Sequence, residues 1–444
     1  MGNLQKVAVF YIVALLLMTY GYAVGRFKVY PFKIIEPLVK DYQAFAEGDE
    51  TEQPTTVLEK FQNDVGISFK RITYDYPEAA DDNTVEVMLP TQRERRGPAL
   101  IYVHPDHQQG YRAIVGAFDL EESLWGAILF DGAGQPIHHW NLSTEHLPDN
   151  REPDQNKNLY PAYIFQDGSV IFNMAEAGGG IVKVDACGNE VWNLPGSFHH
   201  VVQPDEHGYF WSFIGTQIHI NQDIVKVSVE TGEIVKTIMM EDVREANPEV
   251  AIWNLHLMVF NEAKANMSHA NDVEPLPSYL VDKYPLFEEG DLVISYAVTN
   301  NVFVLDQDTL KVKWWRIGHT DLQHDPDWEP SGNIVLFSNN PRTKGTSDIV
   351  AIDPVTLSKT VLFDGAEMGV FTSINGDHQL TSWGTRMVVS STQGWAFELD
   401  ESGKVIFSFV NATDIEERQA LHLSRGFHFD ADYFTSRFWE TCID

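Results

Sequence analysis

Three histidine motifs recur at matched positions along the chain. His200 and His324 each lie eight residues before a glycine that closes a turn leading into an apolar strand, and Tyr160 has the same spacing. His269 occupies the unit between them, where an insertion separates it from its glycine but similar residues follow it. A second imidazole, His199, directly precedes His200. Because a repeated fold brings equivalent positions together, we predict that these residues share one site.

Clustered imidazoles support two kinds of chemistry. Three histidines can bind zinc or another transition metal, and Asp272, Asp325 and Asp327 lie close enough in sequence to add ligands. Alternatively, a neutral imidazole can attack an electrophile and hold it as a phospho- or sulfo-type intermediate. A neighbouring histidine would then take a proton from the acceptor near neutral pH. Both interpretations require the histidines to converge.

The elements that would position these residues follow a repeat. An apolar strand, an aspartate or serine, a few turn residues and a second apolar strand recur at intervals of roughly 45 residues, with one longer interval. The six copies occupy residues 127–134, 181–188, 224–232, 302–309, 349–356 and 396–403. Such a period predicts a β-propeller in which each unit is one four-stranded blade, with the Asp/Gly turn between its outer two strands. We therefore predict an all-β, six-bladed propeller whose innermost strands start beside a central channel.

The composition agrees with such a fold and excludes other classes of function. The 444 residues are 43% hydrophobic and 12% aromatic, which suits a large β-rich core. The formal net charge of −33 excludes a nucleic-acid backbone as the main partner and disfavours docking on anionic lipid through the globular surface. The two cysteines, Cys187 and Cys442, exclude a disulfide framework and a cysteine zinc site but leave room for a single bridge.

The chain divides into three predicted parts. Residues 7–24 form an uncharged apolar run, close to the roughly 20 residues that span a bilayer. Residues 1–33 are therefore predicted as a membrane anchor, with a cleaved signal peptide as the alternative. Residues 34–98 are predicted as a connector with short helices near 34–46 and 58–69, and residues 99–444 as the propeller. A long acidic domain after the anchor is typical of an exported domain, so we expect the propeller to be extracytoplasmic. The sequence leaves a homo-oligomer open.

Several motifs together resemble those of one known family. They are His269-x-Asn271-Asp272-Val-Glu-Pro-Leu, Gly290-Asp-Leu-Val-Ile-Ser, Gln323-His324-Asp325-Pro326-Asp327, Asp353-Pro-x-Thr and the closing Leu423-Ser424-Arg425. The combination is similar to that of the bacterial arylsulfate sulfotransferases, and the resemblance covers roughly residues 160–433. Members of this family are six-bladed propellers, exported or membrane-anchored, that move a sulfuryl group between phenols without the nucleotide sulfate donor.

The resemblance implies a ping-pong route through a sulfohistidine. By position, His324 matches the nucleophile of the family, and His269 matches the histidine of its His-x-Asn motif. His199 and His200 match its His-His pair. The resemblance also implies small phenolic and aryl sulfate substrates as partners, no cofactor and no obligatory transition metal.

One position departs from the family pattern. The family has an arginine a few residues after the Gly-Asp-Leu strand, where it would hold the sulfate, but the aligned residue here is Ala297. We expect Arg316, together with Asn271 and Tyr160, to bind the substrate, and Arg386 is a second candidate cation. Without a cation the charge on the transferring group is poorly stabilised. A non-catalytic, membrane-anchored propeller that binds or assembles partners is therefore the alternative. A quinoprotein is disfavoured, because that fold usually has more blades and a vicinal cysteine pair.

Overall fold

The computed structural model describes residues 72–73, 85–87, 89, 99–119, 124–142, 158–175, 180–215, 222–253, 269–414 and 419–441. All of them belong to Thr55–Asp444, the second of two compact units. The predicted membrane anchor and the predicted connector helices lie outside the described residues. Within the described ranges, no helix is long and apolar enough to cross a membrane.

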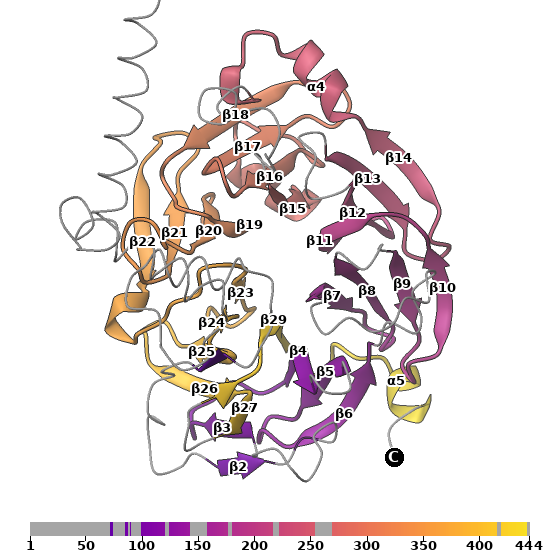
Figure 1. The fold of residues 1–444 in the computed structure, drawn as a ribbon, viewed down its shortest axis with the longest axis vertical. Helices are drawn as coiled ribbons and strands as arrows, with labels where there is room; N and C mark the ends of the chain where they lie inside the picture. The colour runs from indigo at the N-terminus through magenta and orange to yellow at the C-terminus, as the bar shows by residue number, and fades with distance from the viewer. Residues whose placement is uncertain are drawn as a thin grey trace, which may run out of the picture. The chain divides into compact units, whose positions relative to one another are not determined.

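Six antiparallel sheets surround one axis, and each has one strand nearest to that axis (Figure 1). From the axis outward, the first four sheets are β7 (Asn158–Ile164), β8 (Val170–Ala175), β9 (Ile181–Val184) and β10 (Glu190–Leu194); β11 (Phe198–Pro204), β12 (Tyr209–Ile214), β13 (Asp223–Ser228) and β14 (Ile234–Ile238); β15 (Ala270–Pro275), β16 (Leu292–Tyr296), β17 (Asn301–Leu305) and β18 (Val312–Ile317); and β19 (His324–Trp328), β20 (Ile334–Ser338), β21 (Asp348–Ile352) and β22 (Lys359–Asp364). The fifth sheet has β23 (Asp377–Leu380), β24 (Arg386–Ser390), β25 (Trp395–Leu399) and β26 (Val405–Val410), extended outward by β3 (Ala99–Val103) and β2 (Val85–Val87). The sixth has β29 (Leu423–Phe429), β4 (Tyr111–Asp119), β5 (Leu124–Phe130) and β6 (Pro136–Asn141). The six-bladed β-propeller predicted from the repeat is confirmed.

Strands from distant parts of the sequence close the ring. β29 is the innermost strand of the sixth blade, and it pairs with β4 so that Phe427 lies opposite Ala113. A buried ion pair ties this blade to the fifth, because Arg112 on β4 lies 2.8 Å from Glu398 on β25 and both side chains are fully buried. The ring therefore cannot open without breaking a backbone ladder and exposing a buried charge pair.

The aspartate turns of the repeat have a physical basis in side-chain hydrogen bonds. Between β5 and β6, the Asp131 Oδ1 atom accepts the backbone N–H groups of Ala133 at 2.9 Å and Gln135 at 2.8 Å. Gly134 has a φ of +79°, a left-handed conformation that glycine adopts without steric cost. The carboxylate and the glycine together make a tight connection between the outer strands of the blade.

The strands between the inner and outer edges of the blades form most of the core. All five residues are buried in each of β16, β17, β20, β21 and β25. Neighbouring blades cover both faces of these strands, so their sequences are continuous apolar runs rather than alternating ones. Each buried Val, Leu or Ile side chain contributes about 1.5–3 kcal/mol. By contrast, the outermost strand β22 has no buried residue and lies at the rim.

The remaining described elements lie outside the six sheets. They are α4 (Met240–Ala246), η2 (Ala251–Trp253), η4 (Ser278–Lys283), η5 (Gly365–Glu367), α5 (Ser436–Thr441) and a three-stranded sheet of β1 (Ile72–Thr73), β28 (Gln419–Ala420) and β27 (Ala412–Asp414). Within the predicted connector, 34–98, the described elements are the strands β1 and β2.

Helix α5 anchors the end of the described chain against the first and sixth blades. Its Phe438 side chain is fully buried and stacks on Trp140 with ring centroids 6.0 Å apart. Gly168 leaves room for it, because a Cβ atom there would lie 2.2 Å from the Phe438 ring. Nearby, Cys187 is disulfide-bonded. The other cysteine of the sequence, Cys442, lies outside the described residues.

Candidate active site

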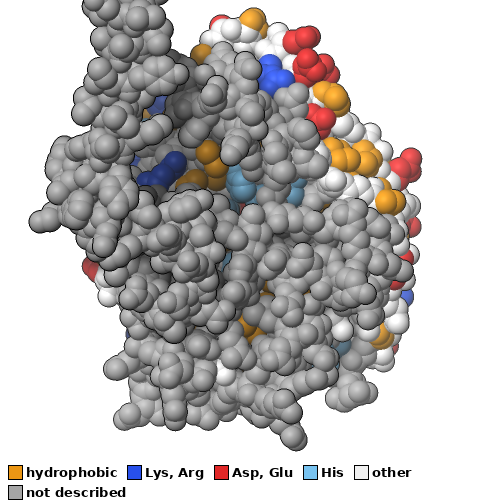
Figure 2. All heavy atoms as spheres, viewed as in Figure 1, with side chains coloured by type: hydrophobic (Ala, Val, Ile, Leu, Met, Phe, Trp, Pro, Cys, Tyr) orange, Lys and Arg blue, Asp and Glu red, His pale blue; other side chains and the backbone are white. Residues whose placement is uncertain are grey.

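Histidines stand at the start of four inner strands. His199 and His200 lie in β11, His324 begins β19, and His269 and His422 immediately precede β15 and β29. The antiparallel register is interrupted close to each of these positions. Such irregularities bend a strand and redirect its side chains. Figure 2 shows histidine side chains near the middle of one face of the protein.

Two of these histidines have strained backbones. His200 has a φ of 64° and His269 a φ of 49°. A left-handed conformation of a residue other than glycine costs about 1–3 kcal/mol and persists only where the surroundings hold it. Conformations of this kind concentrate at active sites and ligand clamps. The strain therefore supports a functional interpretation of this end of the inner strands.

Three imidazoles form a continuous hydrogen-bonded chain. The Nδ1 atoms of His199 and His200 lie 2.8 Å apart, and the Nε2 atoms of His200 and His269 lie 3.0 Å apart. In each contact one nitrogen must donate a proton and the other must accept it. A proton received at one end of the chain can therefore be passed to the other end.

Burial keeps these imidazoles neutral at physiological pH. Desolvation, followed by repulsion from His269, lowers the pKa of His199 to about 3. Desolvation and then His324 lower the pKa of His269 to about 4. The pKa of His200 is likewise well below its usual value, mainly because of burial and then because of the other three histidines. His324 acts electrostatically on both His200 and His269, so the four predicted catalytic histidines come together in the structure.

The tautomer of His324 follows from its hydrogen bonds. Its Nδ1 atom lies 2.8 Å from Oδ1 of Asn339 and 3.1 Å from the Leu322 carbonyl, and both of these atoms can only accept. Nδ1 therefore carries the proton, and Nε2 keeps its lone pair, which receives the Asn375 backbone N–H at 3.2 Å. Burial lowers the pKa of His324 to about 4, although the bonds to Asn339 and Leu322 act against this shift. His324 is thus held as a neutral imidazole with its lone pair on Nε2.

A fifth histidine, His422, joins the site and was missed from the sequence. Its Nε2 atom lies 3.0 Å from Nδ2 of Asn375, the residue whose backbone contacts His324. Burial lowers the pKa of His422 to about 3. A signal for it did exist, because His422 directly precedes the Leu423-Ser424-Arg425 motif just as His269 directly precedes β15. Asn339 and Asn375 carried no comparable signal.

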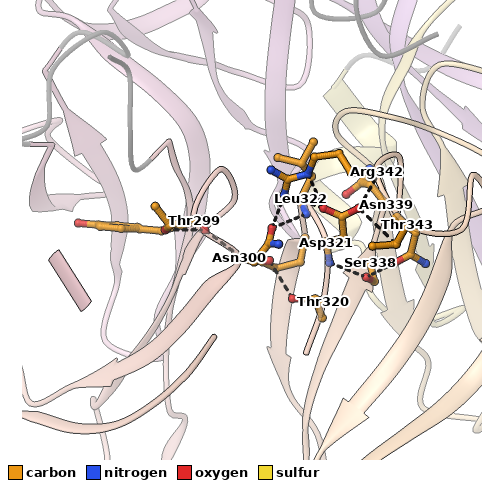
Figure 3. Close-up of polar contacts among 12 residues, drawn as sticks. Thr299, Asn300, Thr320, Asp321, Leu322, Ser338, Asn339, Arg342 and Thr343 are labelled. Carbon is orange, nitrogen blue, oxygen red and sulfur yellow. Dashed lines mark hydrogen bonds and ion pairs between the residues drawn. The ribbon is translucent and has the colours of Figure 1, made fainter. Parts of the chain in front are cut away.

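A polar network holds the loop that leads into β19 (Figure 3). Asp321 accepts the Arg342 Nε–H at 2.6 Å, and the same guanidinium donates to Oδ1 of Asn300 at 2.6 Å. That Asn300 oxygen also accepts the Leu322 backbone N–H at 2.9 Å. The backbone N–H of Asp321 donates to Ser338 at 3.2 Å. The loop is thereby fixed to both β20 and the preceding blade.

The glutamine of the Gln-His motif has a supporting role. The fully buried Gln323 donates through Nε2 to Ser295 Oγ at 3.0 Å and accepts from Thr320 Oγ1 at 2.8 Å. Its backbone carbonyl accepts the Asn271 Nδ2–H at 2.8 Å. Asn271 therefore links β15 to the residue before His324, and it orients the motif from the neighbouring blade.

The predicted substrate-binding residues are distributed differently from the histidines. Arg316 lies on β18, the outermost strand of its blade, with its guanidinium 5.9 Å from the centre of the Trp314 ring. The structure therefore does not bring Arg316 to the histidines. The second candidate cation, Arg386, donates to Glu329 at 2.6 Å. Tyr160 lies on the innermost strand β7, but its side chain is outside the described residues.

The position of the missing arginine lies beside the histidine chain. Ala297 is 1% exposed, and its backbone N–H donates to the His269 carbonyl at 3.1 Å. A side chain at position 297 therefore starts from a residue whose backbone is hydrogen-bonded directly to that of His269. The described hydrogen-bond partners of His324 are neutral.

Comparison with known proteins identifies a family. The model of the family described as "Arylsulfotransferase (ASST)" matches residues 162–412, more than half of the 444-residue chain. This match spans β8 to β26 and includes the four catalytic histidine candidates. No curated protein matches the sequence.

The solved structures that match this chain share little sequence with it. A protein of unknown function from Bacteroides caccae has 9% identity and a TM-score of 0.47, with 72% of this chain and 98% of that chain covered. A streptogramin B lyase has 10% identity and a TM-score of 0.39, with 78% and 87% covered. TolB from Acinetobacter baumannii has 10% identity and a TM-score of 0.42, with 71% and 66% covered.

Proposed function

The chain belongs to the arylsulfotransferase family, and from this premise we propose that it transfers a sulfuryl group from an aryl sulfate to a phenolic acceptor through a sulfohistidine at His324. The observation that carries the proposal is the state of this imidazole. Asn339 and Leu322 hold the proton on Nδ1, and burial keeps the ring neutral, so the lone pair is on Nε2, where it attacks sulfur once the hydrogen bond from the Asn375 backbone N–H opens.

The first half of the reaction transfers the sulfuryl group to the protein. The Nε2 lone pair of His324 forms a bond to sulfur while the bond between sulfur and the aryl oxygen breaks. The aryl oxygen leaves with the bonding electrons as a phenolate, which takes up a proton. The sulfated ring carries a positive charge that the Nδ1–H bond to Asn339 spreads toward the amide oxygen.

The second half returns the group to an acceptor. The oxygen of the acceptor phenol forms a bond to sulfur, the bond between sulfur and Nε2 breaks, and the electrons return to His324. The phenolic proton passes to His269 or His200, which are neutral and hydrogen-bonded to each other at 3.0 Å. The chain can then move the charge on to His199 at 2.8 Å from His200. The same chain supplies a proton to the phenolate of the next cycle.

The absence of an arginine at Ala297 shapes this proposal. A sulfuryl group in transfer carries negative charge on its oxygens, and fixed donors around it lower the barrier. In the described site, imidazole N–H groups and the Asn375 side-chain amide are close to His324. We assign the binding of sulfate oxygens to these neutral donors, which predicts weaker stabilisation than a guanidinium would give.

The compartment of action is part of the same proposal. Residues 7–24 have the composition of a membrane anchor, and the globular part carries the excess of acidic residues. A disulfide at Cys187 supports an oxidising environment, since stable disulfides are rare in the cytosol. We place the propeller on the extracytoplasmic side of a membrane.

The test is turnover of a chromogenic aryl sulfate with a phenol acceptor. We expect His324→Ala to remove turnover by several orders of magnitude, as loss of a covalent catalyst does. His207 lies in the turn between β11 and β12, where its exposed side chain contacts Glu289, and it provides a matched control: His207→Ala should retain activity. Intact-protein mass measurement after reaction with donor alone should show one added SO₃ group, absent in His324→Ala.

A non-catalytic binding propeller is the second candidate, and the alanine at position 297 favours it. Wild-type protein that forms no sulfated intermediate with any aryl sulfate would support this alternative. His324→Asn with near wild-type transfer would exclude His324 as the nucleophile.

A further inference from the structure

Carboxylates gather on the inner strands immediately after the histidines. Asp272 lies on β15, Asp325 and Asp327 on β19, and Asp377 on β23. Glu274 follows on β15. Asp325 and Asp377 are buried, whereas Asp272, Glu274 and Asp327 are half-buried. The Glu274 carboxylate accepts the Trp328 backbone N–H at 3.1 Å, which joins β15 to β19. These residues form a second layer around the axis, which we call the acidic layer.

The positive charges of the acidic layer do not balance its carboxylates. Arg425 on β29 lies 3.2 Å from Asp377, and its pKa is raised by four of the carboxylates. The other nearby arginine, Arg386, is paired with a sixth carboxylate, Glu329, at 2.6 Å. The five carboxylates of the layer are therefore matched by Arg425 and by an arginine, Arg386, that is shared with Glu329. An excess of carboxylates over guanidinium groups at close range favours the uptake of protons or of a cation.

A buried histidine points directly into this layer. The Nδ1 atom of His378 lies 3.3 Å from Oδ2 of Asp327, and the His378 side chain is fully buried. Arg386 approaches the same Nδ1 atom at 3.2 Å. Because a guanidinium can only donate, Nδ1 is the acceptor and carries a lone pair. The lone pair of Nδ1 therefore accepts the Arg386 N–H, while the Asp327 Oδ2 atom lies 3.3 Å from the same nitrogen.

The three side chains have the geometry of a ligand set. One ligand atom from each of Asp325, Asp327 and His378 lies within 4.8 Å of the other two. Asp325 is further oriented by its Oδ2 atom, which accepts the His378 backbone N–H at 2.6 Å. Because Nδ1 of His378 accepts from Arg386, it is the unprotonated nitrogen of the ring, as ligation requires. A cation bound among these atoms would take the place of the Arg386 N–H on Nδ1, and Arg386 would keep its pairing with Glu329 at 2.6 Å.

We infer that Asp325, Asp327 and His378 bind one divalent transition cation, of the Zn²⁺ or Mn²⁺ class, in the acidic layer. An imidazole nitrogen with two carboxylate oxygens suits these ions, whereas Ca²⁺ and Mg²⁺ prefer oxygen ligands throughout. This site is distinct from the histidine chain and does not depend on sulfuryl transfer. Its position has a consequence for the site, because Asp325 directly follows His324 on β19. A bound cation offsets negative charge next to the place where an anionic substrate would bind.

The experiment measures cation binding rather than activity. The full chain is dialysed against a chelator, and Zn²⁺ and Mn²⁺ are then titrated separately by calorimetry and by thermal unfolding. We expect one site per chain and a rise of the unfolding midpoint by several degrees with excess cation, because a ligand that binds only the folded state stabilises it. Asp327→Asn should abolish both effects.

Two variants make the result specific. Asp291 is a buried carboxylate paired with Lys313 at 2.9 Å, so Asp291→Asn controls for the loss of a buried charge elsewhere and should bind the cation as wild type does. Without cation, Asp327→Asn should be at least as stable as wild type, because it removes one of the crowded carboxylates. This result separates loss of a ligand from loss of the fold.

Other outcomes overturn the inference. Absence of Zn²⁺ and Mn²⁺ binding at millimolar concentration would show that protons alone neutralise the layer. Binding that survives in Asp327→Asn but is lost in His200→Ala would place the cation on the histidine chain. Displacement of the cation by an equal concentration of Ca²⁺ would contradict a nitrogen ligand.

Discussion

The Nδ1 atom of His324 lies 2.8 Å from Oδ1 of Asn339. The amide of Asn339 cannot turn round, because its Nδ2 atom donates to the carbonyls of Thr372 at 2.8 Å and Asn375 at 2.6 Å. The oxygen of the amide therefore always faces the imidazole. This contact fixes the tautomer of His324 and leaves the lone pair on Nε2, the atom that we propose as the nucleophile.

The first prediction concerns Asn339→Ala. Loss of the orienting bond should lower kcat about 100-fold, the size of effect that a small misplacement of a reacting group can have. The acid limb of the pH–rate profile should also move to lower pH, because the bond to Asn339 raises the pKa of His324. The exposed Asn193, which contacts Glu190, provides the control variant Asn193→Ala. A fall in kcat with an unmoved pH profile would reduce Asn339 to a structural role.

The second prediction is a dependence of stability on pH through His422. Burial lowers its pKa from 6.5 to about 3 in the folded protein. On acidification the unfolded chain therefore binds a proton that the folded chain does not, so this histidine removes stability as pH falls from about 6.5 towards 3. At pH 5 the loss is roughly 2 kcal/mol relative to neutral pH.

The variant His422→Asn isolates this contribution. Its free energy of unfolding, measured with urea at pH 7.5 and pH 5, should fall by roughly 2 kcal/mol less than that of wild type. The carboxylates of the acidic layer have raised pKa values and act in the opposite direction, because their folded forms bind protons first. That opposing effect is common to both proteins and cancels in the comparison. An equal fall in the two proteins would show that His422 is not buried in a neutral form.

The repeat explains why the fold could be predicted from the sequence. The Asp-x-x-Gly turns recur because each blade needs the same tight connection, and the carboxylate of Asp131 shows the hydrogen bonds that demand this residue type. The glycine spacing then located His200 and His324 at equivalent positions on inner strands. These relationships are local in sequence, so they are visible without a structure.

The missed residues depend on contacts between distant segments. Asn339 and Asn375 meet His324 only after three separate chain segments are brought together around the axis. Arg316 was predicted to bind substrate, but the structure does not bring it to the histidines. It follows Trp314 and Trp315 in the sequence, yet nothing in these residues shows that β18 is the outermost strand of its blade. Sequence spacing predicts position within a repeat, but it does not predict which side chains fill the space between repeats.

The third prediction uses two glycines of one blade to test the docking of α5. Gly168 and Gly188 both have left-handed backbones, with φ of +78° and +81°. A Cβ at Gly188 would meet nothing within 4 Å, whereas one at Gly168 would lie 2.2 Å from the Phe438 ring. Gly188→Ala should therefore cost about 1 kcal/mol from backbone strain alone. Gly168→Ala should cost about 2–4 kcal/mol, since overpacking adds to the strain.

The check is the free energy of unfolding in urea. It is measured for Gly168→Ala and Gly188→Ala, each in the wild-type chain and in a chain that also carries Phe438→Ala. Truncation of Phe438 should remove most of the difference between Gly168→Ala and Gly188→Ala. A difference that persists in full without the ring would assign the overpacking to Ala186, whose Cβ would lie 2.9 Å from the added methyl group, rather than to α5.

The last prediction is that an arginine restored at position 297 improves catalysis. The Ala297 N–H donates to the His269 carbonyl at 3.1 Å, so a side chain placed here starts beside the histidine chain. A guanidinium would add charge-assisted hydrogen bonds to the sulfate oxygens, which contribute about 1.5–3 kcal/mol each. Ala297→Arg should therefore raise kcat/KM for an aryl sulfate by about tenfold or more.

Because Ala297 is 1% exposed, the added volume itself has a cost, and Ala297→Met measures that cost without the charge. Ala297→Met should lower kcat/KM or leave it unchanged, and the ratio between the two variants gives the effect of the charge. If both variants lose activity equally, the sulfate does not bind next to His269, and the neutral donors around His324 are not acting in place of the family arginine.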